Sequence, residues 1–352
     1  MCIERQLPVT RYYGSKRKLI KKIWEVFDEL HLQFGSVLDV FGGSGVFSYS
    51  SKCCNKDVTY NDIFTFNYYI GKALLSNFAS PIDPNRILNL LNEHEGILYR
   101  NTIEENYRDV YFLDEENHLI DVIVQNIDIE FDNEFEKASA FYVLFQTCLI
   151  KRPFNLFHRK NLSLRTNHIT SNFGNKITWE KSFHELFEQF IKELQEVQFN
   201  NRRINNITNT SALNCNVEAD LVYIDPPYFN SKGSHISYHS RYHFLEGLTN
   251  YNELEDFISL EKNNKEIQIN HSKEFESRSN FCDDMRQLLS KHINSIIVIS
   301  YRDSGYPSIE EIKKILSEFK PEENIHSINL GEYSYALNRS RIKANEYLII
   351  GR

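Results

Sequence analysis

The stretch "SVLDVFGGSGVF", residues 36–47, predicts a short buried strand, a glycine-rich turn and a helix that begins at Val46. Glycine tolerates the backbone of such a turn and lets backbone N–H groups approach a ligand closely. The turn holds Gly43 and Gly45, but a dinucleotide-binding fingerprint needs a third glycine where this chain has Ser48. The stretch is therefore compatible with a ligand site at the end of a first strand, and it disfavours one for NAD.

Strands and helices alternate around this stretch. The segment "DVTYNDI" (57–63) predicts a second strand, and "TFNYYIGKALLSNF" (65–78) predicts a helix. Further strands are expected at residues 202–207, 220–224 and 295–301, helices at 15–32, 242–260, 279–291 and 308–319, and a closing strand pair at 324–330 and 345–351. This alternation is typical of an α/β protein in which helices cover a parallel sheet.

The alternation stops between residues 80 and 199. Helices are expected there near residues 84–93, 134–150 and 179–197, separated by polar and charged stretches. A chain of 352 residues also exceeds the size at which one hydrophobic core keeps growing. We therefore expect one α/β domain, formed by residues 1–79 and 200–352, and a mainly helical insertion formed by residues 80–199.

The net charge of −8 is unevenly distributed. Residues 104–136 carry twelve acidic side chains against the single base Arg108, whereas residues 9–22 carry six bases and no acid. Residues 151–181 carry seven bases against Glu180. Local basic patches, rather than the overall charge, decide whether a protein can meet phosphates, so a nucleic-acid partner is not excluded.

The composition is that of an ordinary soluble chain, with 41% hydrophobic and 25% charged residues. The opening residues 1–10 lack the apolar stretch of a signal peptide, and no apolar run reaches the roughly 18 residues of a membrane span. The six cysteines show no metal-binding spacing and are expected to be reduced thiols. The histidines at 235, 239 and 243 are disfavoured as a metal site. These features favour a cytoplasmic protein without a metal.

The segment "ADLVYIDPPYFN", residues 219–230, carries the most specific chemistry. An apolar strand ends at Asp225, Pro226, Pro227 and Tyr228, at the sheet edge where open α/β folds bind ligands. A carboxylate, a fixed carbonyl and an aromatic face suit a planar base that bears an amino group. Asp62, at the end of the second strand, can accept hydrogen bonds from two ribose hydroxyls, which points to a nucleoside-type ligand.

These motifs occur together in the order found in DNA adenine-N6 methyltransferases. The chain resembles the Dam-type, or D12 class, group through "YYGSK" (12–16), "DVFGGSG" (39–45), "ND" (61–62) and "DPPY" (225–228). The resemblance extends through residues 242–248, 299–312 and 345–351, and more loosely through "KRPFNLFHRKN" (151–161). It implies a Rossmann-like S-adenosylmethionine-dependent methyltransferase fold, in which the insertion is a target-recognition domain between the cofactor motif and the catalytic motif.

The resemblance also implies the residues of the cofactor site. S-adenosyl-L-methionine would be bound by Tyr12, Gly14, Lys16, Asp39, Phe41, Gly43, Gly45, Asp62, Ile63, Ser211 and Asp225. Relatives often carry an aspartate for the cofactor's adenine amine where this chain has Ser211. A serine hydroxyl is a weaker acceptor than a carboxylate, which puts cofactor affinity in doubt, and Asn209 is the alternative acceptor.

The implied mechanism needs no covalent enzyme intermediate. Asp225 and the Pro226 carbonyl would each accept one N6–H of adenine, which turns the nitrogen lone pair toward the donor methyl group. Proximity and hydrogen bonds that strengthen in the transition state then supply the rate. Because a base inside a duplex cannot reach such a pocket, the adenine must be flipped out, with Tyr228 as its stacking surface.

The insertion is expected to contact double-stranded DNA. The basic residues proposed to do so, interleaved with aromatic side chains, are Lys151, Arg152, Arg159, Lys160 and Arg165. The acidic segment 104–136 should either face away from DNA or shield the site until a partner binds. The resemblance further suggests a restriction–modification setting with a companion endonuclease, and we expect a monomer.

Two other functions remain open from the sequence. A cytosine-N4 methyltransferase would share the fold, but such enzymes more often carry serine where this chain has Asp225. A DNA-binding module that keeps the fold without turnover would fit the Ser211 departure, whereas the intact motif from Asp225 to Tyr228 disfavours it.

Overall fold

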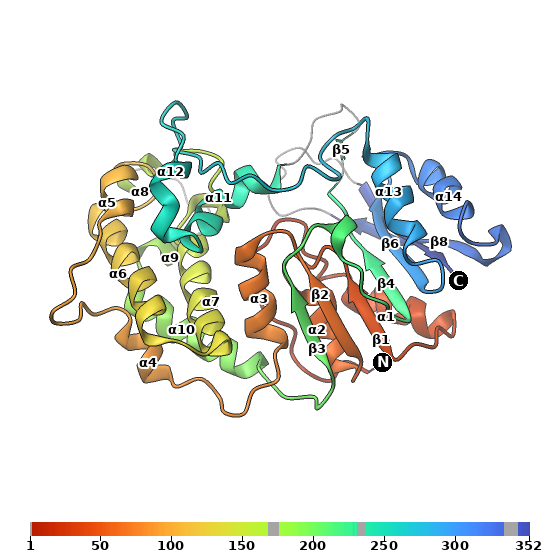
Figure 1. The fold of residues 1–352 in the computed structure, drawn as a ribbon, viewed down its shortest axis with the longest axis horizontal. Helices are drawn as coiled ribbons and strands as arrows, with labels where there is room; N and C mark the ends of the chain where they lie inside the picture. Colours follow the sequence, from red (N-terminus) through yellow and green to blue (C-terminus); the bar gives the residue numbers. More distant parts are fainter. Residues whose placement is uncertain (1, 168–175, 228, 231–236, 334–343) are drawn as a thin grey trace.

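The computed structural model describes residues 2–167, 176–227, 229–230, 237–333 and 344–352. The ribbon shows two units side by side, a sheet unit that holds both chain termini and a helical unit, with one helix, α3 (Thr65–Leu75), at their junction (Figure 1). Two residues outside the described ranges matter for the predictions: Tyr228, and the histidine at position 235.

A seven-stranded sheet forms the centre of the first unit. Its order is β3-β2-β1-β4-β6-β9-β8, and every neighbouring pair from β3 to β6 is parallel. The last two strands close the sheet, because β9 runs antiparallel to both β6 and β8. The strands are β1 (Ser36–Asp39), β2 (Asp57–Asn61), β3 (Asn205–Thr208), β4 (Leu221–Ile224), β6 (Ile296–Arg302), β8 (Ile325–Tyr333) and β9 (Ala344–Gly351). The expected parallel sheet with a closing strand pair is confirmed.

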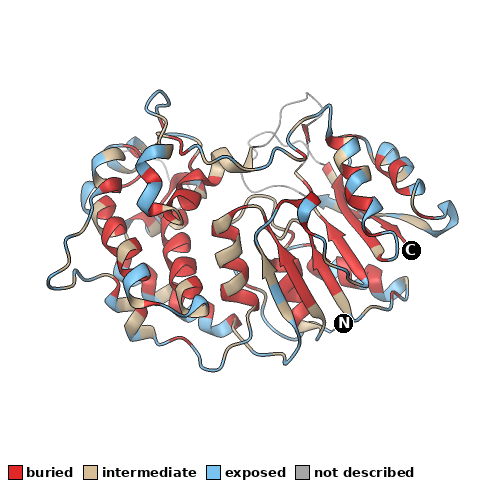
Figure 2. Cartoon of the chain, viewed as in Figure 1, coloured by how far each residue is buried: buried red, intermediate tan, exposed pale blue. Residues whose placement is uncertain are grey.

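Helices cover both faces of the sheet, so the inner strands β1, β2, β4, β6 and β9 are buried along most of their length, whereas the edge strands β3 and β8 are only partly buried (Figure 2). In β4, Leu221 and Tyr223 pack toward α1 (Ile20–Glu29), and the alternate residues Val222 and Ile224 pack toward the opposite face. That face is covered by α13 (Phe281–Ser290) and α14 (Ile309–Ser317). Burial on both faces explains why the strand sequences are continuous apolar runs.

The helical unit contains most of the insertion. Its helices are α4 (Pro84–Asn89), α5 (Thr102–Asn106), α6 (Asp114–Glu130), α7 (Glu134–Ile150), α8 (Ser163–Thr166), α9 (Lys176–Glu180) and α10 (Phe183–Val197). The remaining elements are α2 (Val46–Cys53), α11 (Tyr238–Leu248), α12 (Leu254–Phe257), the strand pair β5 (Phe229–Asn230) and β7 (Gly305–Tyr306), and the 3-10 turns Pro153–Asn155, Ala212–Asn214, Tyr251–Glu253 and Glu322–Asn324.

The helical unit extends beyond the predicted insertion. Phe244 and Leu248 of α11 and Leu254 of α12 belong to the same hydrophobic core as the helices of residues 80–199. The helix expected at 242–260 instead begins at Tyr238 and ends at Leu248, and a turn separates it from α12. A segment that follows the catalytic motif in sequence therefore completes the core of the preceding helices.

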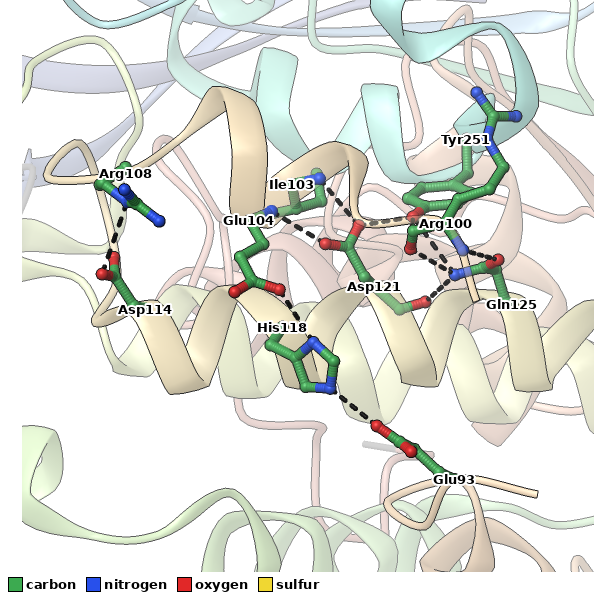
Figure 3. Close-up of polar contacts among 10 residues, drawn as sticks. All are labelled: Glu93, Arg100, Ile103, Glu104, Arg108, Asp114, His118, Asp121, Gln125 and Tyr251. Carbon is green, nitrogen blue, oxygen red and sulfur yellow. Dashed lines mark hydrogen bonds and ion pairs between the residues drawn. The ribbon is translucent and has the colours of Figure 1, made fainter. Parts of the chain in front are cut away.

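Much of the acidic segment 104–136 is the helix α6, which the sequence analysis did not identify. Asp121 of α6 accepts hydrogen bonds from the backbone N–H groups of Ile103 and Glu104, at the start of α5 (Figure 3). His118 lies between Glu93 and Glu104, with 2.9 Å from each ring nitrogen to a carboxylate oxygen. Part of the acidic charge therefore connects elements within the helical unit.

One expectation about cysteines is wrong. Cys2 and Cys54 are joined by a disulfide bond, whereas Cys53, Cys148, Cys215 and Cys282 are free thiols. The bond connects the start of the chain to the end of α2, two positions whose proximity no sequence spacing indicates. Among the described residues, no helix combines the length and the apolar character needed to cross a membrane.

Candidate active site

A cavity of about 380 Å³ lies at the carboxyl ends of β1, β2 and β4. This is the edge at which parallel α/β sheets bind ligands. The predicted site residues that line it are Tyr12, Gly14, Lys16, Asp39, Phe41, Gly43, Asp62, Ile63, Asp225 and Pro227. Gly45, Ser211 and Pro226 adjoin these residues in sequence or in space without lining the cavity. The structure thus brings together four motifs that are far apart in the chain.

The glycine-rich turn is held in place by Asp62. The Asp62 carboxylate accepts hydrogen bonds from the N–H of Gly43 at 2.8 Å and from the N–H of Phe64 at 2.9 Å. Gly43 has a φ of +49° and Gly45 a φ of +70°, conformations that favour glycine. Burial raises the pKa of Asp62 to about 6. The turn after the first strand is therefore hydrogen-bonded to the residue that follows the second strand.

Asp39 presents an unused acceptor at the same place. Its Oδ2 accepts a hydrogen bond from the Ser48 hydroxyl at 2.7 Å, and its Oδ1 has no hydrogen-bond partner among the described residues. Burial raises the pKa of Asp39 to about 7. Because a buried unpaired carboxylate oxygen is costly, a cationic ligand group would relieve it. Ser48, which argued against NAD in the sequence, orients this carboxylate.

Asp225 meets a lysine and a second acid. Lys16 Nζ lies 2.8 Å from Asp225 Oδ1 and 3.3 Å from Glu346 Oε1. Burial raises the pKa of Asp225, Lys16 lowers it and Glu346 raises it, and the result is a pKa of about 6. The sequence analysis missed Glu346, which lies in β9; "NEYLIIG" predicted its strand but gave no reason to place its side chain at the site.

Aromatic rings form one wall of the cavity. Tyr12 stacks on Tyr242 of α11, with ring centroids 4.8 Å apart, and the hydroxyl of Tyr242 accepts a hydrogen bond from the Tyr13 N–H at 2.7 Å. The Arg241 guanidinium lies 3.7 Å from the centre of the Tyr13 ring. The helix α11 thus fixes the "YYGSK" segment, and with it Lys16.

The segment 266–276 lines the cavity and was not predicted. It is anchored to the helical unit, because His243 Nδ1 accepts a hydrogen bond from the Ile267 N–H at 3.0 Å. At its other end, the Glu274 carboxylate accepts hydrogen bonds from the Ser211 hydroxyl at 2.9 Å and the Leu213 N–H at 3.1 Å. Ser211 is therefore already engaged, and the position expected to lack a carboxylate has one beside it, from Glu274.

Asn209 and the histidines have other roles in this structure. Asn209 donates hydrogen bonds to the carbonyls of Asp62 and Ile63, and its own carbonyl accepts one from Thr65. His239 Nε2 lies 2.8 Å from the Ile267 carbonyl, which places it, like His243, at the segment 266–276. No group of side chains in the described residues could hold a metal ion.

Three of the five residues proposed to contact DNA are buried. Glu116 forms ion pairs with Lys151 at 2.6 Å and with Arg165 at 2.7 Å. The Arg152 guanidinium lies over the Tyr111 ring at 4.2 Å and is fully buried, and this burial lowers its pKa to about 9. The structure therefore argues against direct phosphate contacts by Lys151, Arg152 and Arg165, because their charges are already used inside the helical unit.

Arg159 and Lys160 are exposed, in agreement with a role at the surface. Their segment lies close to the cavity, since the Phe157 N–H donates to the Arg241 carbonyl at 2.9 Å and Arg241 contacts Tyr13. Phe154, in the same segment, is partly exposed and has a φ of +68°, an uncommon conformation for a residue other than glycine.

Comparisons with known proteins agree with this arrangement. The chain is similar to the Type II methyltransferase M2.HphI of Haemophilus parahaemolyticus, with 24% identity over 88% of both chains. It is similar to the Type II methyltransferase M.NlaIII of Neisseria lactamica, with 22% identity over 88% of both chains. It is 26% identical to the modification methylase StsI of Streptococcus sanguinis over 88% of this chain, which spans about half of that protein (46%).

The family model of the D12 class N6 adenine-specific DNA methyltransferases matches residues 12–329, which is most of the chain. The match begins at Tyr12 and includes every described segment that lines the cavity. The chain therefore belongs to the D12 class of N6 adenine-specific DNA methyltransferases, enzymes that methylate N6 of adenine in DNA.

Proposed function

We propose that this chain methylates adenine N6 at one short recognition sequence in double-stranded DNA, and that Asp225 is its catalytic carboxylate. One observation carries the proposal: Asp225 lies in the same cavity as the two buried acceptors Asp39 and Asp62. A site for a base amine and a site for a charged nucleoside are thereby joined in one space. Methyl transfer needs this arrangement, because the two reacting groups must meet in a fixed orientation.

Methyltransferases of this family use S-adenosyl-L-methionine, whose sulfonium supplies an electrophilic methyl group. The cavity fits such a donor, since the buried Asp39 carboxylate has an oxygen without a partner that a cationic ligand group would satisfy. We assign the cofactor to Asp39, Asp62, Ile63 and the turn at Gly43, with Tyr12, Gly14 and Phe41 in the cavity walls and Gly45 shaping the turn behind them. Glu274 beside Ser211 supplies the acceptor that serine alone would provide weakly.

The target adenine is assigned to the side of the cavity at Asp225. There the Asp225 carboxylate and the Pro226 carbonyl accept the two N6–H groups, and the carboxylate takes up the proton that N6 loses on methylation. The adenine reaches this position by flipping out of the duplex. Tyr228 remains the proposed stacking surface for the base, and it lies outside the described residues.

The helical unit is assigned to DNA recognition, with Arg159 and Lys160 as phosphate contacts. Both are exposed, and their segment is bonded to α11, which packs on the "YYGSK" wall of the cavity. Of the five basic residues expected to contact DNA, we therefore keep only Arg159 and Lys160. We also propose that residues 238–267 belong with residues 80–199 in the recognition domain, because the ring of Phe244 packs against those of Tyr107 and Phe157.

Because the relatives carry the names Type II methyltransferase and modification methylase, we propose a restriction–modification setting. In that setting the protein would act as a monomer, in the cytoplasm, and protect the sites cut by a companion endonuclease. DNA from a methylation-free host that expresses this chain should then resist an endonuclease that cuts the methylated sequence. It should remain sensitive to endonucleases that cut other sequences.

The first experiment is modification-sensitive long-read sequencing of DNA from a methylation-free host that expresses this chain. We expect N6-methyladenine at one short motif, and none with Asp225→Ala. The matched control is Asp132→Ala, which removes an exposed acid and should leave methylation intact. Methylation that survives Asp225→Ala would overturn the catalytic assignment. N4-methylcytosine, found by nucleoside analysis, would overturn the assigned base.

A further inference from the structure

A cluster of three charged side chains, two of them buried and the third (Asp225) 21% exposed, lies at the target-base site. Lys16 Nζ is 2.8 Å from Asp225 Oδ1 and 3.3 Å from Glu346 Oε1, so one ammonium group serves two carboxylates. The Lys16 side chain is 4% exposed and that of Glu346 1%. We refer to Asp225, Lys16 and Glu346 as the charge cluster.

Glu346 is the member of the charge cluster that the proposed chemistry does not use. Its Oε1 also accepts a hydrogen bond from the Ser300 hydroxyl at 2.8 Å, from the neighbouring strand β6. Its Oε2 has no hydrogen-bond partner among the described residues. A buried acid with an unsatisfied oxygen is costly, and a shorter or apolar side chain would fill this strand position at lower cost. The arrangement therefore calls for a functional reason.

The geometry provides one. In this structure the ammonium of Lys16 occupies Asp225 Oδ1, the kind of acceptor that an incoming amine needs. A strong charge-assisted hydrogen bond to Lys16 would compete with the weaker bond from a neutral N6–H. Glu346 offers Lys16 a second ionised acceptor 3.3 Å away, so that its ammonium can turn from one carboxylate to the other without entering water.

We propose that Glu346 is a positioning residue for adenine methylation: it holds Lys16 beside Asp225 and draws the ammonium toward itself when the target amine binds. This inference rests on the proposed function, in which Asp225 accepts from N6. In the reaction, the N6 lone pair forms the bond to the methyl carbon as the carbon–sulfur bond of the donor breaks, and one N6 proton passes to Asp225. Glu346 touches neither the base nor the methyl donor.

Other ionisable groups face Asp225 and must be separated from this effect. Tyr223 on β4 and Tyr238 on α11 are close to it, and burial raises the pKa of both far above neutrality, so both stay uncharged. Asp39 on β1 interacts electrostatically with Asp225 and has a raised pKa of about 7. The pH dependence must therefore be compared between variants that keep Asp39 and differ only within the charge cluster.

The test measures the single-turnover methylation rate of a DNA duplex carrying the recognition sequence, from about pH 5 to about pH 9. Glu346→Gln keeps the size of the side chain and removes its charge. We expect its plateau rate to fall about tenfold, a part of the 10²–10⁴-fold that a positioned base contributes. The acidic limb of the profile should move to lower pH, because the repulsion between two acids is lost. Lys16→Met should move that limb to higher pH.

Three further measurements make the result specific. Glu310→Gln, which removes an exposed acid of α14, should leave rate and profile unchanged. Cofactor affinity of Glu346→Gln should match the parent, and its melting temperature should be equal or higher, because a costly buried charge is removed. Glu346→Asp keeps the charge but moves it away from Lys16, because the side chain is shorter. It should change the plateau rate and the acidic limb in the same direction as Glu346→Gln, to a smaller extent. This variant replaces Glu346→Gln in the test if the glutamine variant does not fold.

A Glu346→Gln profile that coincides with the parent, or a limb displaced in the same direction as in Lys16→Met, would overturn the inference. A failure of the proposed function looks different: Asp225→Ala would then keep methylating. The two ideas can therefore fail separately in one set of variants.

Discussion

The molecule contains two buried ion clusters of opposite design. In the helical unit, one acid, Glu116, serves the two cations Lys151 and Arg165. In the sheet unit, one cation, Lys16, serves the two acids Asp225 and Glu346. Both clusters are largely withdrawn from water, and they differ in how completely their polar atoms are paired.

The Glu116 cluster is saturated. Glu116 accepts hydrogen bonds from Lys151, from two nitrogens of Arg165 and from the Leu113 N–H at the start of α6. Burial raises the pKa of Glu116, but the hydrogen bonds and charges of Arg165 and Lys151 outweigh it, so the pKa lies below its ordinary value. In the charge cluster, by contrast, the pKa of Asp225 is raised, and Glu346 has an oxygen without a hydrogen-bond partner among the described residues. The Glu116 cluster is therefore fully paired, whereas the charge cluster retains an unpaired acceptor.

The largest expected effect is the loss of activity in Asp225→Asn. The variant keeps the shape of the side chain and removes the charged acceptor, so methylation should slow by about 10²–10⁴-fold. Since the buried charge is costly in the free protein, the melting temperature should stay the same or rise. Parallel rate and thermal-unfolding measurements test both parts. A large loss of stability would place Asp225 with the saturated type of cluster.

The converse change in the helical unit should act on stability. Glu116→Gln leaves Lys151 and Arg165 buried without their counter-charge, and breaking a buried pair in this way costs about 3–5 kcal/mol. Urea unfolding gives the free energy, and methylation per folded molecule should change little. Glu115→Gln, an exposed neighbour on α6, is the control. If Glu116→Gln leaves stability intact but abolishes DNA binding, the cluster is part of the interface after all.

A smaller effect is expected from Asp39, on the pH dependence of both stability and cofactor affinity. Because burial raises its pKa to about 7, the folded protein binds this proton more tightly than the unfolded chain does. The free protein should therefore lose stability as pH rises from about 4 to about 7. Affinity for S-adenosylmethionine should rise over the upper part of the same range, since the cationic donor favours the ionised acid. Calorimetric titration at several pH values, with Asp39→Asn as the comparison, should show a flattened dependence in the variant.

The smallest effect is expected at His118. The hydrogen bond to Glu93 raises its pKa, burial lowers it slightly, and Glu104 raises it further. The stabilisation is therefore complete below the ordinary histidine pKa and is lost as pH rises through the raised value. Its partners are largely solvated, so His118→Gln should cost under about 1 kcal/mol, and only at acidic pH. An equal cost at pH 9 would show that the ring acts through packing.

The sequence predicted what depends on local pattern. The bounds of α7, Glu134–Ile150, agree with the predicted helix, and the capping box of Ser308 and Glu311 begins α14 as expected. The motif at Asp225 ends a buried strand because an apolar run stops there at two prolines. The same reasoning could not assign partners. A basic residue in a basic stretch reveals its charge but not the distant acid that buries it, as with Lys151 and Glu116.

What the sequence missed comes from long-range contacts. Glu274 lines the cavity and Glu346 lies behind it, and only the fold places them beside Ser211 and Lys16. The helix α11 follows the catalytic motif in the chain yet packs with helices that precede it. Periodicity in the sequence predicts that a helix such as α11 forms, but not which neighbouring helices it packs against.

The segment 266–276 has a consequence for how such proteins can diversify. It is bonded to α11 at one end and to the loop before β4 at the other, and it lines the cavity between them. Residues 80–199 are therefore not a cassette that can be exchanged by itself, because α11 and α12 would then face a foreign core. A functional chimera would have to inherit two separate stretches of one parent, 80–199 and roughly 238–276. Under the proposed role of these helices in DNA recognition, a change of sequence specificity would require coordinated change on both sides of the catalytic motif.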